Sequence, residues 1–439
     1  MTWWTEGGEI WDADLRASVL ANTLDRFNER WLLQGIANVP AIARSLDVDS
    51  LRSLGGLPAV IVSPGPSLDC DGELLRRVAR RVVVIAASHS LRALRRMGVR
   101  PDLVVSLDAE PSDHFAGVSE HEFGGLVLSA VADPALFQRK PGRRWVHLAA
   151  GAEWLCAAYP DSPVLQSGGC VSGLALSLAL HAGCWPIALV GQDLALTDDG
   201  HLYSAASQDA MTVASAPDAG GWFTATCTDG GELRALSVTL PGLHGAPVKS
   251  HRVFQIYRDW FAHVARRVFE RRGVRIVNCT SFGARIDHCE EIPLNKWIAR
   301  TPQPQGWNDL VVSTYATGPV DSALASAAVA GPHERRRMMN AHLCALRVQL
   351  ARVETAAQVC ALIAEDGSAS ALEAAEAVLR GNMGVLGLPI SALRLADFMA
   401  VQRRLLSAQG LARLRAARAL YQLMASAART LSGALPETC

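Results

Sequence analysis

The central part of the chain alternates short apolar runs with segments of helical periodicity. Four runs are rich in Val, Ile, Leu and Ala, at 57–62, 81–88, 101–108 and 186–193. Helical patterns lie between them, for example from Leu91 to Met97 and from Leu174 to Gly183. Near-continuous apolar strands joined by helices are typical of parallel strands that are buried on both faces. The pattern therefore predicts an α/β core, a mostly parallel sheet with helices on both faces.

The two ends of the chain carry helical patterns only. Residues 1–55 have apolar side chains at helical spacings, which predicts a helical segment packed on the core. Beyond the Pro- and Gln-containing stretch 302–306, the chain is rich in Ala, Leu and Arg. The expected helices there are His333–Ala364, Ala369–Arg380, Ser391–Gln409 and Leu411–Leu431. They predict a C-terminal helical bundle that serves either as structural support or in oligomerisation and protein docking.

A polar insertion interrupts the core after the strand at 186–193. Asp198–Ala246 is rich in Gly, Ser, Thr and Asp. Within it, alternation at Gly221–Thr228 and a return at Leu233–Leu240 predict a β-hairpin. A long insertion beyond a strand end is a candidate lid. The chain then continues with an expected amphipathic helix at Val248–Arg271 and a last strand at Val274–Cys279.

Two glycine-containing turns stand at the starts of helical patterns. The first follows the strand at 57–62, and the second precedes the helix at 174–183. A helix start offers free N–H groups to an anion, and glycine lets the backbone approach a ligand closely. The sequence thus predicts a phosphate-binding site made of Gly65, Pro66, Ser67, Ser167, Gly168, Gly169 and Ser172. Ordinary turn geometry and close helix–sheet packing explain the same glycines without a ligand.

Polar side chains follow the other strands of the predicted sheet. These residues are Ser88, Asp108, Gly191, Gln192 and Asp193. Because ligands bind beyond the carboxyl ends of parallel strands, we expect them to converge with the Gly65 turn at one site. The two carboxylates suit ribose hydroxyls, or a metal if one binds. Helix capping and solvation of the strand ends are the alternative roles of these carboxylates.

Composition narrows the class of partner. The chain has 439 residues, half of them apolar, which suffices for two or three domains with a sizeable core. Its 42 basic and 42 acidic residues cancel, so nothing predicts a nucleic acid as partner. The ten cysteines lack zinc-site spacing and favour a cytoplasmic location. No apolar run approaches the ~18 residues expected of a membrane span.

Taken together, the motifs of the central part of the chain resemble those of the motility accessory factor family of flagellin glycosyltransferases. The resemblance spans roughly 57–297. Its motifs are Gly65-Pro66-Ser67-Leu68-Asp69, Arg100-Pro101-Asp102, Ser106-Leu107-Asp108, Gly168-Gly169, Gly191-Gln192-Asp193-Leu194 and Val277-Asn278-Cys279-Thr280. The order of these parts is also similar to that in bacterial CMP-sialic acid-dependent sialyltransferases.

The resemblance implies a fold, a domain organisation and an activity. The fold is a modified Rossmann-like core that binds a CMP-activated nonulosonic acid of the pseudaminic, legionaminic or sialic type. The implied domains are a helical segment at 1–55, a catalytic domain at 56–300 and a helical domain at 301–439. The implied reaction is an inverting transfer of the sugar to Ser or Thr of flagellin, in support of flagellar assembly and motility. No tightly bound cofactor is expected, and a divalent metal, Mg²⁺ or Mn²⁺, stays open.

Catalytic roles also come from the resemblance. Tyr203, which follows the Gly191-Gln192-Asp193 strand end, is implied to hydrogen-bond the departing phosphate. The related sialyltransferases carry a histidine ahead of the late helix, where this chain has Lys249, with His251 two positions on. His201 is a further candidate for the general base that takes the proton of the acceptor hydroxyl.

Two other classes of function remain open. Archaeal hydroxymethylpterin pyrophosphokinases share part of the signature, so a nucleotide-dependent phosphotransferase is one alternative. It would need two ligands for Mg²⁺ and cations on the β/γ-phosphates of a nucleotide, although the Gly65 turn lacks the Gly-Lys-Ser/Thr of a P-loop. The other alternative is a non-catalytic flagellin-binding protein on the same core. A homo-oligomer through the C-terminal helices is compatible with all three.

Overall fold

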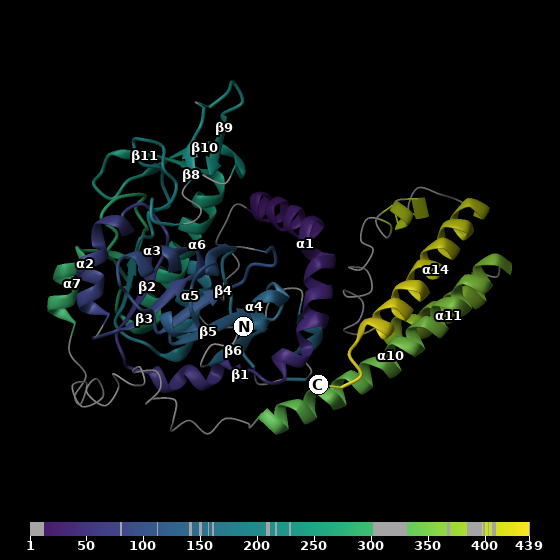
Figure 1. Cartoon of the computed structure of the whole chain (residues 1–439). Helices are drawn as coiled ribbons and strands as arrows, with labels where there is room; N and C mark the ends of the chain where they lie inside the picture. The colour runs from purple at the N-terminus through teal and green to yellow at the C-terminus, as the bar shows by residue number, and fades with distance from the viewer. Residues whose placement is uncertain are drawn as a thin grey trace.

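The computed structural model divides into a core built on a large sheet, a small second sheet and a helical arm (Figure 1). It describes residues 13–301, 332–366, 369–383 and 410–438, together with a few positions between 397 and 405. Short gaps within the first range fall at 80, 112, 140–142, 149–151, 157, 160–161, 208–210, 216 and 228–229.

The large sheet has nine strands in the order β1-β6-β5-β4-β3-β2-β7-β12-β13. Every neighbouring pair is parallel. The strands are β1 (Leu46–Asp47), β2 (Ala59–Val62), β3 (Val83–Ala87), β4 (Leu103–Ser106), β5 (Gly125–Ser129), β6 (Arg144–His147), β7 (Ile187–Val190), β12 (Val277–Asn278) and β13 (Glu290–Glu291). The predicted parallel, Rossmann-like α/β core is confirmed.

Alternate residues of each central strand enter different layers. In β2, Ala59 and Ile61 belong to one apolar cluster, whereas Val60 and Val62 belong to another. The first cluster includes the wholly buried helix α5 (Val171–Ala182), and the second includes side chains of α2 (Leu68–Val78) and α3 (Leu91–Arg96). Because side chains of a strand point alternately to the two faces, apolar residues at every position produce a sheet that is buried on both faces.

Some boundaries differ from the sequence expectations. β5 and β6 were not expected, because their short runs contain Gly125 and Trp145 and lack the long β-branched pattern of the central strands. The expected amphipathic helix from Val248 begins later. Pro247–His251 forms strand β11, and helix α6 runs from Arg252 to Arg272. Pairing with β10, which the sequence pattern does not reveal, holds these five residues extended.

The polar insertion forms most of the second sheet, which lies at the top of the core in Figure 1. Its antiparallel strands are β8 (Met211–Val213), β9 (Trp222–Cys227), β10 (Glu232–Pro241) and β11, in the order β11-β10-β9-β8. The predicted hairpin corresponds to β9 and β10. Leu196 N–H donates to Lys249 O at 2.8 Å, which connects this sheet to the segment that follows β7.

Helices from both ends of the chain share one apolar cluster with the far half of the large sheet. Leu32 and Val39 of α1 (Ala13–Ile42) lie in this cluster with Leu343 and Val353 of the arm. The arm consists of α10 (Pro332–Asp366), α11 (Ala369–Met383) and α14 (Gly410–Ala434), in agreement with three of the expected helices. The fourth expected helix, Ser391–Gln409, lies outside the described residues apart from isolated positions.

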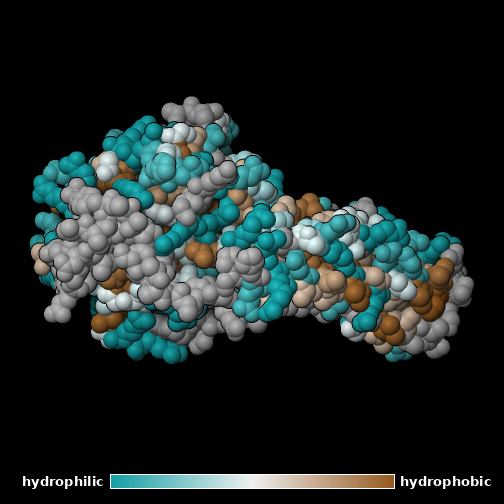
Figure 2. Space-filling model, turned by 60° about the horizontal axis from the view of Figure 1, so that its bottom comes forward, coloured by the Kyte–Doolittle hydropathy of each residue, from teal (hydrophilic) through white to brown (hydrophobic). Residues whose placement is uncertain are grey.

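The arm projects from the core and displays apolar side chains among polar ones (Figure 2). Exposed examples are Val348, Val359 and Leu362 on α10 and Val378 on α11. Nowhere in the described ranges is a helix both long and apolar enough to cross a lipid bilayer. The nine described cysteines all carry free thiols.

Candidate active site at the ends of β2 and β7

A cavity of about 150 Å³ opens where the strand order changes direction. From β2, the chain builds the sheet outward through β3 to β6, and it later returns to place β7 on the other side of β2. Ligands of open α/β sheets bind at such a switch point, beyond the carboxyl ends of the strands. The cavity is lined by Ser63, Pro64 and Gly65 after β2 and by Gly191, Gln192 and Asp193 after β7.

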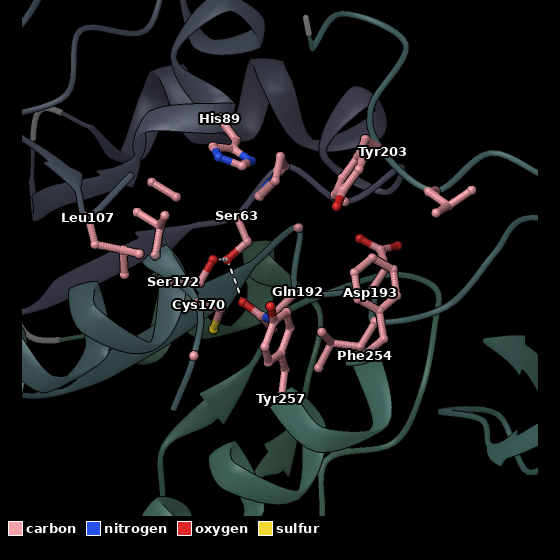
Figure 3. A pocket seen from close by; sticks show the side chains of 18 of the residues that line it. Ser63, His89, Leu107, Cys170, Ser172, Gln192, Asp193, Tyr203, Phe254 and Tyr257 are labelled. Atoms are coloured by element: carbon pink, nitrogen blue, oxygen red, sulfur yellow. Dashed lines mark hydrogen bonds between the residues drawn. The ribbon is translucent and has the colours of Figure 1, made fainter. Parts of the chain in front are cut away.

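Three polar side chains from separate elements meet in this cavity (Figure 3). The hydroxyl oxygens of Ser63 and Ser172 are 2.9 Å apart, and the Ser63 hydroxyl is 2.5 Å from Gln192 Oε1. Gln192 N–H in turn donates to Thr280 Oγ1 at 3.1 Å. Thr280 N–H donates to Asn278 Oδ1. The sequence motif around β12 therefore helps to hold Gln192 in place at the cavity. This network fixes hydroxyl and amide groups at the wall of the cavity.

The turn that begins with Gly65 is held by Asp193. The Asp193 carboxylate accepts hydrogen bonds from Ser67 N–H at 3.1 Å and from the Ser67 hydroxyl at 2.8 Å. It thereby caps the start of α2 from a distant strand. Burial raises the pKa of Asp193 to about 7, although the Ser67 hydrogen bonds oppose that rise. Asp193 therefore positions the turn as well as lining the cavity.

Gly65 packs closely against the end of β7. A Cβ atom at this position would lie 1.9 Å from Asp193 Oδ2 and 2.4 Å from Gly191 O. The missing side chain thus makes room for the end of β7, in line with the packing alternative given for the glycine turns. Gly65 still lines the cavity with its backbone.

The second glycine turn is divided between packing and the cavity. Gly168 has φ +61°, and a Cβ there would lie 2.3 Å from the Trp260 ring, which indicates close packing against α6. Gly169 has φ +89° and lines the cavity beside Tyr257. Ser167 does not line it, and its hydroxyl oxygen accepts a hydrogen bond from Gly169 N–H at 3.2 Å. Pro66, Ser67, Ser88 and Gly168 are likewise absent from the lining.

Asp108 lies at the opposite wall with two histidines. Its Oδ2 atom is 3.3 Å from His89 Nε2 and 4.0 Å from His114 Nδ1. Burial tends to raise the pKa of Asp108, but the facing His89, together with His114 and a hydrogen bond from Ser88, lowers it below its ordinary value. The carboxyl group is therefore ionised at neutral pH. His89 and Asp108 both line the cavity.

Tyr203 lines the cavity. Figure 3 shows its hydroxyl group directed into the cavity. The backbone beside it is fixed, because Ser204 N–H donates to Pro64 O at 2.8 Å and Ala205 N–H donates to Asp69 Oδ2 at 2.8 Å. The tyrosine is thus held over the Gly65 turn.

The three candidate bases occupy positions outside the cavity lining. His201 pairs with Thr212 at the edge of the small sheet, with Nδ1 3.1 Å from the threonine hydroxyl. Lys249 is exposed on β11. His251 is buried, and its ring centroid lies 3.9 Å from that of Phe254 with the two rings tilted. Neither ring nitrogen has a hydrogen-bond partner among the described residues. Burial lowers its pKa to about 4, so the ring is neutral at neutral pH.

Sequence reasoning missed several residues of the cavity. They are His89, Leu107, Cys170, Leu202, Phe254 and Tyr257. His89 directly follows Ser88 at the end of β3, so the rule that selected Ser88 could have included it. His114 lies on a 3₁₀ turn (Asp113–Phe115) with no strand or motif beside it, so only the folded chain identifies it. Phe254 and Tyr257 come from α6, whose approach to this edge depends on packing.

Comparison with known proteins supports this arrangement of the core. The family model described as 6-hydroxymethylpterin diphosphokinase MptE-like matches residues 34–199, which is less than half of the chain. The structure of a Maf glycosyltransferase from Magnetospirillum magneticum AMB-1 is similar to this one, with a TM-score of 0.53 and 16% sequence identity. This chain has the fold of a Maf glycosyltransferase. A comparison with curated proteins gives no match.

The similarity to the Maf glycosyltransferase structure covers 91% of this chain and 59% of that protein's chain. It confirms, at the level of the fold, the resemblance found in the sequence. The MptE-like match includes the strands β2 to β7 and both glycine turns, but it ends before Tyr203 and the small sheet. The MptE-like match therefore covers the parallel core, whereas Tyr203 and α6, which also contribute to the cavity lining, lie beyond it.

Proposed function

We propose that this protein is a glycosyltransferase that moves a nonulosonic acid from a CMP-activated donor to Ser or Thr of flagellin. The observation that carries this proposal is the position of Tyr203 above the Gly65 turn, at the switch point of a Maf-like fold. Pseudaminic, legionaminic and sialic-type acids are the donors that the sequence resemblance implies.

The charge of the cavity favours a donor with one phosphate. The described residues that line it include no lysine or arginine, but they include the two acidic residues Asp108 and Asp193. A nucleoside triphosphate brings several negative charges, and phosphotransferases meet them with cationic side chains and Mg²⁺. A CMP-sugar carries a single phosphodiester, which hydrogen bonds from backbone N–H groups and a tyrosine hydroxyl can accommodate.

The proposed reaction inverts the anomeric carbon. The acceptor hydroxyl attacks this carbon on the face opposite to the phosphate, and the bond from the carbon to the phosphate oxygen breaks with its electron pair on that oxygen. The Tyr203 hydroxyl donates a hydrogen bond to the departing phosphate, whose negative charge grows in the transition state. Ser63, Ser172 and Gln192 orient the sugar or ribose hydroxyls. The acceptor proton passes to a general base.

The general base is predicted among His201, Lys249 and His251. Removal of such a base costs about 10²–10⁴-fold in rate. Each residue is therefore replaced by alanine, and transfer and CMP binding are measured in parallel. The base is the residue whose loss slows transfer by this order while the affinity for CMP stays unchanged. If all three variants transfer at the wild-type rate, a carboxylate of the cavity takes the proton.

The proposed function is tested by binding and by transfer. Calorimetry compares CMP, UMP and ATP, each with and without Mg²⁺, and CMP is expected to bind without metal. The purified protein is then incubated with flagellin and CMP-pseudaminic or CMP-legionaminic acid, and the intact mass of flagellin is measured. A protein that binds CMP but adds no mass with either donor would be a binding protein instead.

A diphosphokinase is the second candidate, and the MptE-like match at residues 34–199 favours it. Its signature in the same panel is ATP binding that requires Mg²⁺, together with transfer of a diphosphate to a hydroxymethylpterin. The absence of lysine and arginine from the described cavity lining argues against it. The two reactions have different donors, so a single panel separates them.

A further inference from the structure

Three side chains from separate segments converge at one wall of the cavity. His89 lies on a 3₁₀ turn (Ser88–Ser90) after β3, Asp108 follows β4, and His114 lies on the 3₁₀ turn that comes next. One nitrogen of each imidazole and one oxygen of the carboxylate all lie within 4.8 Å of one another. The rings of His89 and His114 are 3.9 Å apart.

The Asp108–His89 contact is a long hydrogen bond, and its length also suits two ligands of a common ion. Charge-assisted N–H···O bonds are about 2.7–2.9 Å long. Here the Asp108 Oδ2 atom is 3.3 Å from His89 Nε2 and 4.0 Å from His114 Nδ1. Two ligands at about 2.0–2.1 Å from a tetrahedral zinc ion are roughly 3.3 Å apart. The distance from Asp108 to His89 already has this value, and the distance from Asp108 to His114 exceeds it by about 0.7 Å.

Neighbouring groups hold the carboxylate in place. The hydroxyl groups of Ser88 and Ser106 each lie 3.4 Å from Asp108 Oδ2. The backbone carbonyl of Asp108 accepts a hydrogen bond from Asp133 N–H at 2.9 Å, and that of His89 accepts one from the Ser207 hydroxyl at 3.0 Å. Metal ligands are commonly oriented by such outer hydrogen bonds. The side chain of His114 is only 6% exposed, so packing fixes its ring.

We propose that His89, Asp108 and His114 bind a divalent transition-metal cation, with Zn²⁺ as the reference ion. Two imidazoles and one carboxylate suit zinc, cobalt and manganese, whereas magnesium and calcium prefer oxygen ligands alone. Three protein ligands leave coordination positions for a further group. His89 and Asp108 line the cavity, so these positions face the space where a ligand binds.

The cation would place positive charge where the described lining has no lysine or arginine. In this position it would attract the phosphate of a nucleotide. This second step rests on the proposed function, whereas binding of the cation does not. The two are therefore tested separately, and the cation is studied first without any nucleotide.

The experiment uses the full chain after treatment with a chelator. Zn²⁺ is titrated by calorimetry, and Co²⁺ is titrated by visible absorption, in which a low-symmetry nitrogen–oxygen site gives d–d bands. We expect one Zn²⁺ ion per chain, a Co²⁺ spectrum that Zn²⁺ abolishes, and no comparable binding of Mg²⁺. His89→Ala, Asp108→Asn and His114→Ala should each weaken Zn²⁺ binding at least tenfold, which corresponds to about 1.4 kcal/mol.

The matched control is His121→Ala, because His121 is an exposed histidine on the neighbouring 3₁₀ turn Glu120–Glu122 and should leave Zn²⁺ binding unchanged. Thermal unfolding of each variant shows whether it is folded. His89 is more exposed than His114, with 27% against 6% of its side chain accessible, so His89→Ala keeps the test valid if His114→Ala does not fold. Wild-type protein that binds no Zn²⁺, or folded variants that bind it as tightly as wild type, would overturn the proposal.

Nucleotide binding then distinguishes this proposal from the proposed function. CMP affinity is measured on the metal-free and the Zn²⁺-loaded protein. If Zn²⁺ binds at these residues but no sugar is transferred, the metal site stands and the proposed function fails. If sugar is transferred by a protein that binds no Zn²⁺, the proposed function stands and the metal site fails.

Discussion

Two aspartates at the carboxyl ends of strands have different partners. Asp193 is buried and accepts two hydrogen bonds from Ser67, which fixes the start of α2. Asp108 faces His89 and His114 at the cavity wall. Both residues follow an apolar strand in the sequence. In the structure, however, Asp193 stabilises a turn, whereas Asp108 faces titratable side chains at the cavity wall. Their substitutions should therefore have different consequences.

Asp193→Asn should change how stability depends on pH. The pKa of Asp193 is raised from 3.8 to about 7 in the folded protein. Between these values the folded state holds a proton that the unfolded state has lost, so the free energy of unfolding falls as pH rises. The contribution is about 1.4 kcal/mol for each pKa unit. Asparagine does not ionise, so the free energy of unfolding of the variant should lack this part of the pH dependence. The variant should be less stable than wild type by a margin that becomes smaller from pH 5 to pH 8.

Urea unfolding at pH 5 and pH 8 measures this difference. Asp71 also has a pKa raised by burial, to about 6, and it is present in both proteins. The comparison therefore reports the ionisation of Asp193 together with its electrostatic interaction with Asp71. Equal deficits at the two pH values would show that Asp193 is ionised in the folded protein across this range.

Tyr203→Phe should slow sugar transfer by about 10²-fold, a loss typical of removing one donor to a developing anion. CMP affinity should change little, because the hydrogen bond strengthens mainly as the phosphate departs. Tyr159→Phe is the matched control, since the Tyr159 hydroxyl donates to the backbone carbonyl of Arg335, away from the cavity. Transfer is followed by the intact mass of flagellin. A Tyr203→Phe protein that transfers at the wild-type rate would remove Tyr203 from the mechanism.

At the scale of elements, the cavity depends on how the ends of β2 and β7 fit together. Gly65 N–H donates to Gly191 O at 2.8 Å, and Gly191 has φ +69°. The turn after β2 therefore lies directly against the end of β7. Such contact leaves no space for side chains, and this explains why a glycine stands at each position.

Gly65→Ala should destabilise the protein, because its Cβ would overlap the Asp193 carboxylate at 1.9 Å. Overpacking of this kind costs about 1–3 kcal/mol. Gly433→Ala on α14 is the matched control, since a Cβ there meets no atom within 4 Å. Thermal melting compares the two variants with wild type. A Gly65→Ala protein as stable as the control, with weakened CMP binding, would restore the view that this glycine makes room for the ligand.

At the scale of the whole molecule, the helical arm is joined to the core by a buried ion pair. Arg335 at the start of α10 lies 2.9 Å from Asp47 of β1, and its guanidinium stacks over Tyr159 at 4.3 Å. His342 on the same helix lies 2.7 Å from the carbonyl oxygen of Trp154. These contacts lie at the edge of the sheet opposite to β12 and β13, so the arm is anchored away from the cavity.

Arg335→Ala should loosen this junction while it leaves the cavity intact. Removing one partner of a buried ion pair costs about 3–5 kcal/mol, because the other charge stays buried. We expect a lower melting temperature and faster proteolysis within α10, with unchanged CMP affinity. Arg336→Ala, at the exposed neighbouring position, is the control. If the loss in CMP binding free energy equals the loss in the free energy of unfolding, the arm and the cavity are coupled.

The sequence alone predicted the features that depend on nearby residues. The apolar runs that become β2, β3, β4 and β7 are near-continuous, because both faces of these strands are buried. Their polar ends and the glycine turns were also visible, since a strand end and a helix start have local signatures. From these patterns the parallel core, the hairpin β9–β10, the helical arm and part of the cavity lining, such as Gly191, Gln192 and Asp193, were predicted. Tyr203 came from the family resemblance.

Only the tertiary structure decided which distant groups meet. Ser67 and Asp193 are 126 positions apart, and Ser63 and Ser172 are 109 apart, so no local pattern could pair them. The same holds for His114, which reaches Asp108 through the packing of a short turn, and for His251, which is buried against Phe254 outside the cavity lining. The spacing of apolar residues along a segment shows which face of that segment is buried. A site is made by contacts between segments that are far apart in the sequence, and these contacts form only in the folded chain.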